Sequence, residues 1–427
     1  MREMKDSGIE WVGAIPRDWQ LSKIGSLYTQ RNEKVSDKDY QPLSVTMQGI
    51  LPQLATAAKT DDGDNRKLVR VGDFAINSRS DRRGSCGISP LDGSVSLINI
   101  ILTPRTAMHP GYYNWLFHTT LFADEFYKWG HGIVADLWTT RWQEMKSITV
   151  PVPEYAEQER IAAFLDAECA EIDAVLEKTR ASIEEYKKLK QAVITQAVTK
   201  GIRGDRPMKD SGIEWIGEIP AEWRKTQLRH CAAIKSGITL GKKYEKTDSL
   251  VERPYLRVAN VQDGYVDLSV LTTIEVTQDE DLKYRLRAGD VLMTEGGDRD
   301  KLGRGCVWHG EIEPCLHQNH IFAVQTSKDT LLPEFLEYLT VSDVGRSYFD
   351  VTAIKTTNLA CTSSSKVLAF TIPLPSVEEQ AEIVEALNTK CAGIDALIVK
   401  KQQYLTEIEN YKKSLIYEYV TGKKEVV

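Results

Sequence analysis

The sequence contains no apolar stretch that approaches the roughly 18 residues needed to span a membrane. Its first twenty residues are polar and interrupted by glycine and proline, which predicts that no signal peptide is present. The seven cysteines are odd in number and scattered, and no Cys-x-x-Cys pair occurs. Reduced thiols are therefore expected rather than a disulfide framework. Together these absences predict a cytoplasmic protein.

An excess of positive charge is also missing. The chain carries 54 Lys+Arg against 61 Asp+Glu, a formal net charge of −7. Residues 17–153 hold 16 basic and 14 acidic side chains, and residues 221–374 hold 19 and 21. Any affinity for a polyanion must therefore come from local patches or from a cationic partner.

Sequence motifs of catalysis are lacking as well. There is no Gly-x-x-x-x-Gly-Lys-Ser/Thr phosphate loop and no Asn-Pro-Pro-Phe or Asp-Pro-Pro-Tyr stretch of the kind an amino-methyltransferase needs. No carboxylate–lysine set typical of a nuclease is found either. We expect no catalysis by this chain; an enzyme with an unrecognised site is the alternative.

One cluster contains metal-ligand side chains, namely Cys306, His309, Cys315, His317 and His320. Zinc sites usually present tight pairs of ligands, whereas the spacing here is loose. A core cysteine with histidines in loops is the simpler interpretation, and no metal is expected.

The chain does contain an internal repeat, which organises everything else. The segment MKDSGIEW at residues 4–11, followed by Ile-Pro and Trp19, recurs at residues 208–215, again followed by Ile-Pro and Trp223. A Pro-x-Pro stop at 151–153 with a following Glu-Gln recurs at 373–375. Within the intervening parts, Arg-x-Gly-Asp at 70–73 matches 287–290.

The repeat predicts an α+β protein with two similar globular domains separated by two long antiparallel helices that form a coiled coil, related by a pseudo-two-fold axis. We place the first element and domain at residues 1–153 and the first long helix at 154–203. The second element and domain follow at 204–375, and the second long helix at 376–427.

Both helices show an apolar seam with a period of about 3.5 residues, the coiled-coil pattern. Ser376 with Glu379 fits a capping box at the start of the second helix. Because neither helix can bury such a seam alone, we expect them to pair with each other, and the N-terminal element to dock near Val420. The alternative is that each helix packs separately on its own domain.

These paired motifs, MKDSGIEWxGxIPxxW and PxPxxxEQxxI with a downstream Ile-Asp, resemble the specificity subunits of type I restriction-modification enzymes over essentially the whole chain. The resemblance implies two target-recognition domains that each read one half of a split, asymmetric DNA sequence. It also implies binding of two methyltransferase (modification) subunits and of restriction (translocase) subunits. S-adenosylmethionine, ATP and Mg are then expected on those partners, and no cofactor in this chain.

Candidate DNA contacts are loops rich in cations and amides, because phosphates bind Lys and Arg while base edges bind Arg, Lys, Asn, Gln, Ser or Thr. In both domains an Arg-containing loop follows the same Gly-Asp strand. The candidates are Ser78, Arg79, Arg82, Arg83 and Arg141 in the first domain, and Lys242, Lys243, Tyr244, Arg299, Lys301, Arg304, Gln318, Asn319, Lys355 and Thr356 in the second.

Each of these clusters alone is also typical of an ordinary solvated loop. A coiled-coil scaffold or interaction protein that reads no DNA is therefore the competing function. A scaffold has no need of large, divergent domains with loops rich in Arg, Asn and Gln, so DNA recognition is the favoured prediction.

Overall fold

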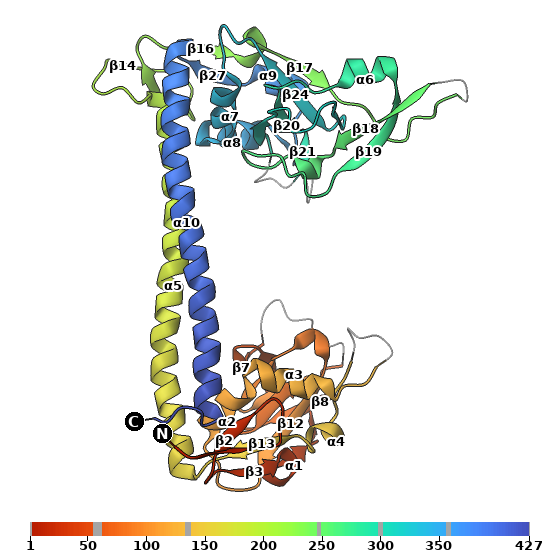
Figure 1. Ribbon diagram of the computed structural model, residues 1–427, viewed down its shortest axis with the longest axis vertical. Coiled ribbons are helices and arrows are strands. Elements are labelled where there is room, and N and C mark those ends of the chain that lie inside the picture. The colour runs from red at the N-terminus through yellow and green to blue at the C-terminus, as the bar shows by residue number, and fades with distance from the viewer. Residues whose placement is uncertain are drawn as a thin grey trace. The chain divides into compact units, whose positions relative to one another are not determined.

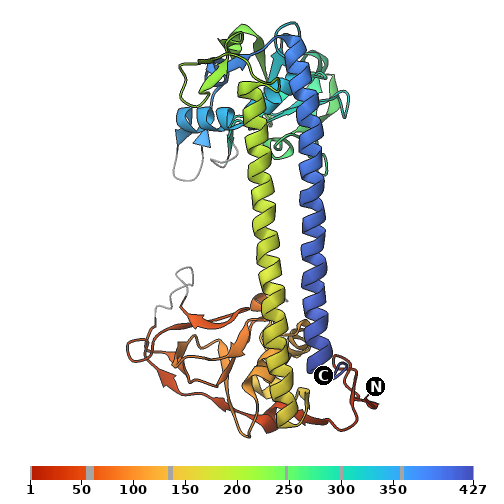
Figure 2. The same cartoon turned by 90° about the vertical axis from the view of Figure 1, so that its left-hand side faces the viewer.

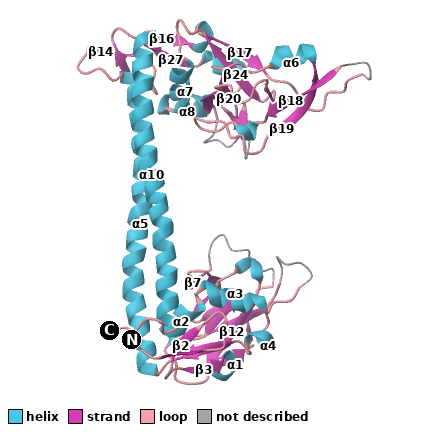
Figure 3. Cartoon of the chain, in the orientation of Figure 1, coloured by secondary structure: helices cyan, strands magenta, loops and turns pink. Residues whose placement is uncertain are grey.

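The computed structural model describes residues 2–53, 62–132, 138–245, 249–297, 302–355 and 360–426. The chain forms two compact units: unit 1 comprises Met1–Arg180 with Gln403–Val427, and unit 2 comprises Ala181–Gln402. Each unit mixes helices and strands, which Figure 3 colours separately. No helix within the described ranges is long and apolar enough to cross a membrane.

Unit 1 consists of short strands and short helices that precede the long helix α5 (Tyr155–Lys200). Helix α2 has Pro110 in its first turn, and the Thr119 hydroxyl caps α3 by accepting the N–H of Phe122 at 3.2 Å. The strands are β1 (Met4–Asp6), β2 (Ala14–Pro16), β3 (Gln20–Lys23), β4 (Tyr28–Arg31), β5 (Lys34–Val35), β6 (Leu43–Thr46), β7 (Gly49–Pro52), β8 (Arg66–Val69), β9 (Phe74–Asn77), β10 (Cys86–Ile88), β11 (Gly93–Val95), β12 (Asn99–Pro104) and β13 (Thr149–Val152). The short helices are α1 (Ile24–Leu27), η1 (Ser80–Arg82), α2 (Pro110–Phe117), α3 (Thr120–Lys128) and α4 (Trp142–Met145).

An antiparallel sheet in the order β10-β9-β12-β4 forms the centre of unit 1. Aromatic side chains fill the core between this sheet and helices α2 and α3. The ring of Phe117 lies 4.5 Å from that of Phe74 and 4.6 Å from that of Phe122, measured between centroids. Strand β3 pairs with β13, so the chain enters and leaves the domain through one two-stranded ribbon.

Unit 2 repeats this plan before the long helix α10 (Val377–Val420). Its strands are β14 (Met208–Asp210), β15 (Glu218–Pro220), β16 (Arg224–Gln227), β17 (Ala232–Ser236), β18 (Leu250–Leu256), β19 (Thr272–Thr277), β20 (Val291–Thr294), β21 (Gly296–Gly297), β22 (Gly305–Val307), β23 (Leu316–His317), β24 (Ile321–Thr326), β25 (Ile354–Lys355), β26 (Ala360–Cys361) and β27 (Thr371–Leu374). Its short helices are η3 (Leu228–His230), η4 (Val258–Asn260), α6 (Gln278–Tyr284), α7 (Pro333–Val341), α8 (Asp343–Thr352) and α9 (Ser364–Ala369).

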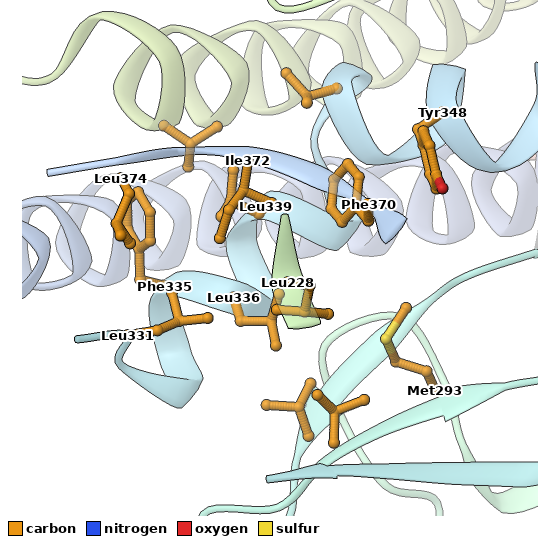
Figure 4. Packing of buried hydrophobic residues seen from close by; sticks show 14 of the residues in the cluster. Leu228, Met293, Leu331, Phe335, Leu336, Leu339, Tyr348, Phe370, Ile372 and Leu374 are labelled. Carbon is orange, nitrogen blue, oxygen red and sulfur yellow. The ribbon is translucent and has the colours of Figure 1, made fainter. Parts of the chain in front are cut away.

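The two units share one topology. The sheet β22-β20-β24-β17 corresponds strand by strand to β10-β9-β12-β4, and the ribbon β16-β27 corresponds to β3-β13. In the matched Gly-Asp turns, Asp73 accepts the N–H of Arg70 at 2.9 Å and Asp290 accepts that of Arg287 at 3.0 Å. Figure 4 shows the core of unit 2, where leucines of α7 pack against β27. The predicted fold class, two similar α+β domains with two long helices, is confirmed.

The long helices run antiparallel beside each other within each unit, as Figures 1 and 2 show. In unit 1 the rings of Phe164 and Tyr419 lie 4.4 Å apart, and Lys412 binds Asp173 at 2.6 Å. In unit 2 Lys190 lies 2.7 Å from Asp395. Because exposed ion pairs contribute at most about 1 kcal/mol each, the buried apolar seam supplies most of the stability. The predicted antiparallel pairing is confirmed.

A three-residue network anchors each domain to the start of a long helix. In unit 2 the Trp223 indole N–H donates to Glu379 at 2.9 Å, and Arg206 binds the same carboxylate at 2.6 Å. The Arg206 guanidinium also lies over the Trp223 ring, 5.1 Å from its centroid. The Ser376 hydroxyl accepts the N–H of Glu379 at 3.3 Å, which is the capping half of the predicted box.

Unit 1 repeats the network with Arg2, Trp19 and Glu157. The Trp19 indole donates to Glu157 at 2.9 Å, and Arg2 donates to the same carboxylate oxygen at 3.0 Å. The Arg2 guanidinium lies 5.7 Å from the centroid of the Trp19 ring. In each unit, the tryptophan of the repeated Pro-Trp motif thus contacts the glutamate of the repeated Glu-Gln motif.

The N-terminal element also contacts the end of α10 within unit 1. Tyr417 and Lys423 both donate to the carbonyl of Val12, at 3.0 and 2.6 Å, and Tyr112 donates to the carbonyl of Val420 at 2.9 Å. The second element follows the end of α5 directly, where Arg206 donates to the carbonyl of Lys200. The predicted docking of the N-terminal element near Val420 is confirmed.

Asn114 in α2 and Glu337 in α7 occupy equivalent positions in the two units. Asn114 accepts the N–H of Ile88 at 3.1 Å, and Glu337 accepts the N–H of Val307 at 3.1 Å. Burial, assisted by two nearby carboxylates, raises the pKa of Glu337 to about 7. Unit 2 therefore uses a titratable carboxyl where unit 1 uses an amide.

Removing the Glu379 side chain should destabilise the protein strongly, because the side chain is only 4% exposed and its loss takes the acceptor from the Trp223 indole and the buried carboxylate partner from Arg206. We expect Glu379→Ala to lower the free energy of unfolding by about 3–5 kcal/mol. Glu157→Ala is the matched variant at a more exposed site and should cost less. Urea unfolding compares the two, and a smaller loss for Glu379→Ala than for Glu157→Ala would contradict the account.

The free energy of unfolding should fall as the pH rises from about 4.5 to about 7, because the folded protein holds the Glu337 proton more tightly than the unfolded chain. The loss should reach up to about 3 kcal/mol. Glu337→Gln should remove this contribution, so its stability should match the wild type near pH 4.5 and exceed it above pH 7. The matched variant Asn114→Asp should introduce the same pH dependence in unit 1. Parallel stability curves for the wild type and Glu337→Gln would show that the site is not coupled to pH.

Candidate nucleic-acid interface

Three chain segments meet in unit 1 where strand β9 ends. Ser78 donates its N–H to the carbonyl of Ile98 at 3.4 Å and accepts the N–H of Thr140 at 3.0 Å. Isolated bridges then connect Arg79 with Thr139, and Thr139 with His131. The loop after the Gly-Asp strand is thereby joined to two segments that are distant in the sequence.

The junction forms a surface depression of about 330 Å³. Arg79 and Arg141 both line it, together with Gln30, Lys67 and the Trp142 side chain. Lys67 donates to the carbonyl of Asn99 at 2.6 Å, and burial lowers its pKa. Guanidinium, amide and indole groups around a concave surface are the side chains that bind phosphates and base edges.

The other predicted residues of unit 1 differ in exposure. Ser78 is buried, and its hydroxyl donates to the carbonyl of Ile98 at 2.5 Å, so this side chain supports the loop. Arg82 ends the turn η1 with its side chain 70% exposed, 3.7 Å from Asp81. Arg83 contacts Asp124 of α3. Of this loop, Arg79 and Arg82 are the cations best placed to meet a ligand.

Unit 2 builds the same junction where β20 ends. Glu295 donates its N–H to the carbonyl of His320 at 2.9 Å and accepts the N–H of Thr362 at 2.7 Å. Strands β21, β26 and β25 then form a three-stranded sheet, in place of the isolated bridges of unit 1. In both units the residue that follows the strand is thus bonded to two segments that are distant in the sequence.

Three of the predicted residues of unit 2 lie on a separate segment near α6. Lys242 forms an ion pair with Glu280, and the Tyr244 hydroxyl donates to the same carboxylate at 2.9 Å. Lys243 is exposed. The charge of Lys242 is therefore balanced within the protein, and the cationic character of this segment comes chiefly from Lys243.

The remaining predictions lie at or near the junction of unit 2. The Gln318 amide oxygen accepts the N–H of Val258 at 3.4 Å, and Asn319 donates its N–H to the carbonyl of Ile238 at 3.2 Å. Arg304 immediately precedes β22 and is half-buried. Lys355 belongs to β25, where only its backbone is described, and Arg299, Lys301 and Thr356 lie outside the described residues.

The cysteine–histidine cluster of the sequence lies mainly in the core of unit 2. Burial raises the pKa values of the Cys306 and Cys315 thiols to about 12 and lowers that of His317 to about 4. Neutral thiols inside a hydrophobic core are poor metal ligands. Among the described ranges, the structure contains no group of three or more His, Cys, Asp or Glu able to hold a metal ion.

Sequence reasoning missed Gln30 and Lys67 of the depression, and it did not identify the pairing of Glu295 with His320. Gln30 is on β4 and Lys67 is on β8, and the depression also includes residues between 78 and 142, so no local motif connects them. Alternation along β4 and β8 could have identified them only as outward-facing positions.

No protein-family model matches the chain. It is 23% identical over 442 residues to the EcoKI type I restriction enzyme specificity subunit of Escherichia coli K12, covering 96% of this chain and 90% of that protein. It is 26% identical over 208 residues to a putative type I restriction enzyme specificity subunit, MjaX, of Methanocaldococcus jannaschii, a match that covers 48% of this chain and 47% of that protein.

Among solved structures, a chain from work on complex assembly and conformational transition of the type I R-M system matches with a TM-score of 0.72. The match covers 96% of this chain and 99% of that one at 16% identity, which is evidence for the fold. The duplicated motifs, the shared topology of the units and the end-to-end similarity to EcoKI agree with one another. Along nearly its whole length the chain is similar to type I restriction enzyme specificity subunits.

Proposed function

We propose that the chain reads a bipartite, asymmetric DNA target, with one half-site recognised by each unit. The observation that carries this proposal is the repeated junction at the ends of β9 and β20, which has equivalent backbone hydrogen bonds and different side chains in the two units. Equivalent backbones place two surfaces in the same way on their domains, and different side chains make those surfaces select different bases.

The chain would carry out this recognition without catalysis of its own and would recruit methyltransferase and restriction subunits. Large apolar side chains exposed on the long helices support such recruitment, because exposed apolar side chains are favourable contacts for a partner. Val175, Tyr404 and Tyr411 are exposed in unit 1, and Leu189, Leu397 and Val399 in unit 2. S-adenosylmethionine, ATP and Mg would be bound by the partner subunits.

The proposal is tested by selecting bound duplexes from a random pool with the chain and its methyltransferase. A split motif should be enriched. Enrichment of no motif would favour the alternative, a coiled-coil scaffold without DNA readout.

Arg79→Ala and Arg141→Ala should weaken the preference at one half-site and leave the other unchanged. Both side chains line the same depression, and loss of a base contact costs about 1–3 kcal/mol. The matched control is Arg70→Ala, because Arg70 precedes β9 and binds Asp92 at 3.1 Å. Competition binding with duplexes altered in one half-site measures the effect. Equal weakening on every duplex would instead identify phosphate contacts.

Removing seven residues from each long helix, 181–187 together with 398–404, should shorten the unread spacer between the half-sites. Seven residues correspond to about 10.5 Å of helix, or roughly three base pairs, and two full turns nearly preserve the helical phase. The selected half-sites should stay the same. The deletion in one helix alone is the control and should impair folding, because it breaks the pairing of the seams. An unchanged spacer in the double deletion would show that the helices do not set the distance.

A further inference from the structure

Ser78 and Glu295 occupy one structural position in the two units. Each accepts the N–H of a threonine, Thr140 or Thr362, and each donates its own N–H to the loop before the next sheet strand. The residues before them, Asn77 and Thr294, are the last residues of β9 and β20 in the two central sheets. Side chains can therefore be compared position by position across the two junctions.

The side chains at these equivalent positions differ in charge. Ser78 is buried with its hydroxyl bonded to the backbone, whereas the Glu295 side chain is 34% exposed. Arg79, which follows Ser78, corresponds to Gly296. Arg141, which follows the threonine of unit 1, corresponds to Ser363. In unit 1 guanidinium groups follow the two hydrogen-bonded residues, whereas in unit 2 these positions are Gly296 and Ser363, and the partly exposed carboxylate of Glu295 precedes Gly296.

The Glu295 carboxylate is held by one side-chain contact, and the backbone that follows it is held by strand pairing. His320 Nδ1 lies 2.5 Å from Glu295 Oε2, and the backbone of β21 is fixed by its pairing with β26. A Cβ atom at Gly296 would lie 3.0 Å from Cys361 Sγ, so glycine permits the close approach of these strands. A carboxylate held in this way has a defined direction, as an acceptor for base recognition requires.

We propose, on the basis of the DNA reading above, that the two units read base edges of opposite hydrogen-bonding character. Unit 1 reads acceptor groups of guanine through Arg79 and Arg141, and unit 2 reads an exocyclic amino group in the major groove through Glu295. Cytosine N4 and adenine N6 are the two amino groups available there.

Electrostatics makes this assignment selective. A carboxylate that meets only phosphates weakens binding to every duplex, because like charges repel. The carboxylate stabilises a complex only where a base presents a donor to it. Glu295 thus selects for an amino group and against the carbonyl oxygens of guanine and thymine.

Duplex selection with the methyltransferase complex tests the inference, using the wild type, Glu295→Ala and Glu295→Gln. Glu295→Ala should lose roughly 5- to 150-fold of discrimination at one position of one half-site. Glu295→Gln keeps the shape of the side chain and should accept adenine, since glutamine pairs with adenine N6 and N7. A shift from cytosine to adenine would identify cytosine as the natural base, and retained adenine would identify adenine. Glu275→Ala, at an exposed position of the separate strand β19, is the control and should leave the motif unchanged.

The outcomes separate this inference from the proposed function. If the wild type enriches no split motif, the DNA reading itself fails. If it enriches a split motif while Glu295→Ala binds every duplex more tightly by one common factor, the carboxylate only repels phosphates and the inference is overturned. A split motif that is unchanged in both Glu295 variants overturns it as well.

Discussion

The carboxylate at the start of each long helix, Glu157 or Glu379, together with the indole and guanidinium that bind it, is the interaction on which the rest of the structure depends. Glu379 is almost fully buried and is compensated by an indole N–H and a guanidinium that belong to the repeated element before the domain. A buried charge that loses such partners is strongly destabilising. The contact therefore specifies that the element containing Trp223 packs on the start of α10. In unit 1, Glu157 in the same way specifies that the element containing Trp19 packs on the start of α5. In unit 1, moreover, this element begins the chain and is also held by the end of α10.

Because these contacts hold each domain at its ribbon, the side chains at the far end of each central sheet can differ between the two units. The ribbons β3-β13 and β16-β27 join each domain to its anchored helix, whereas the junctions lie beyond the ends of β9 and β20. The two junctions share their backbone hydrogen bonds although their side chains differ, so side chains there can change without changing the scaffold. Function on variable loops carried by a constant frame is the usual division of labour in binding proteins.

The arrangement of the repeated elements and the long helices could be predicted well from the sequence, because repeated local motifs encode it. The duplicated element, the two helices, their antiparallel pairing and the docking near Val420 all follow from pattern and periodicity. The role of Glu379 was only half predicted: its position suggested a cap, whereas its carboxylate binds Trp223 and Arg206. An acidic residue in a first helical turn has several possible partners, and sequence does not choose among them.

The candidate site was less predictable, because it is built from segments far apart in the chain. Arg79 and Arg141 converge on one depression through the bridge between Arg79 and Thr139 and the hydrogen bond from Thr140 to Ser78. Ser78 has the composition of a contact residue but is buried, and Lys242 is paired with Glu280 of a later helix. Composition identifies polar loops, while burial and ion pairing, which decide whether a side chain is available, are tertiary properties.

The most direct test of this account is to give both units the same domain. Residues 24–148, which lie between β3 and β13, would be replaced by residues 228–370, which lie between β16 and β27, leaving both anchoring networks intact. Duplex selection with the methyltransferase should then enrich a target that contains the half-site of unit 2 twice. Selection of the original asymmetric target by a folded chimera would contradict the claim that each domain reads its own half-site.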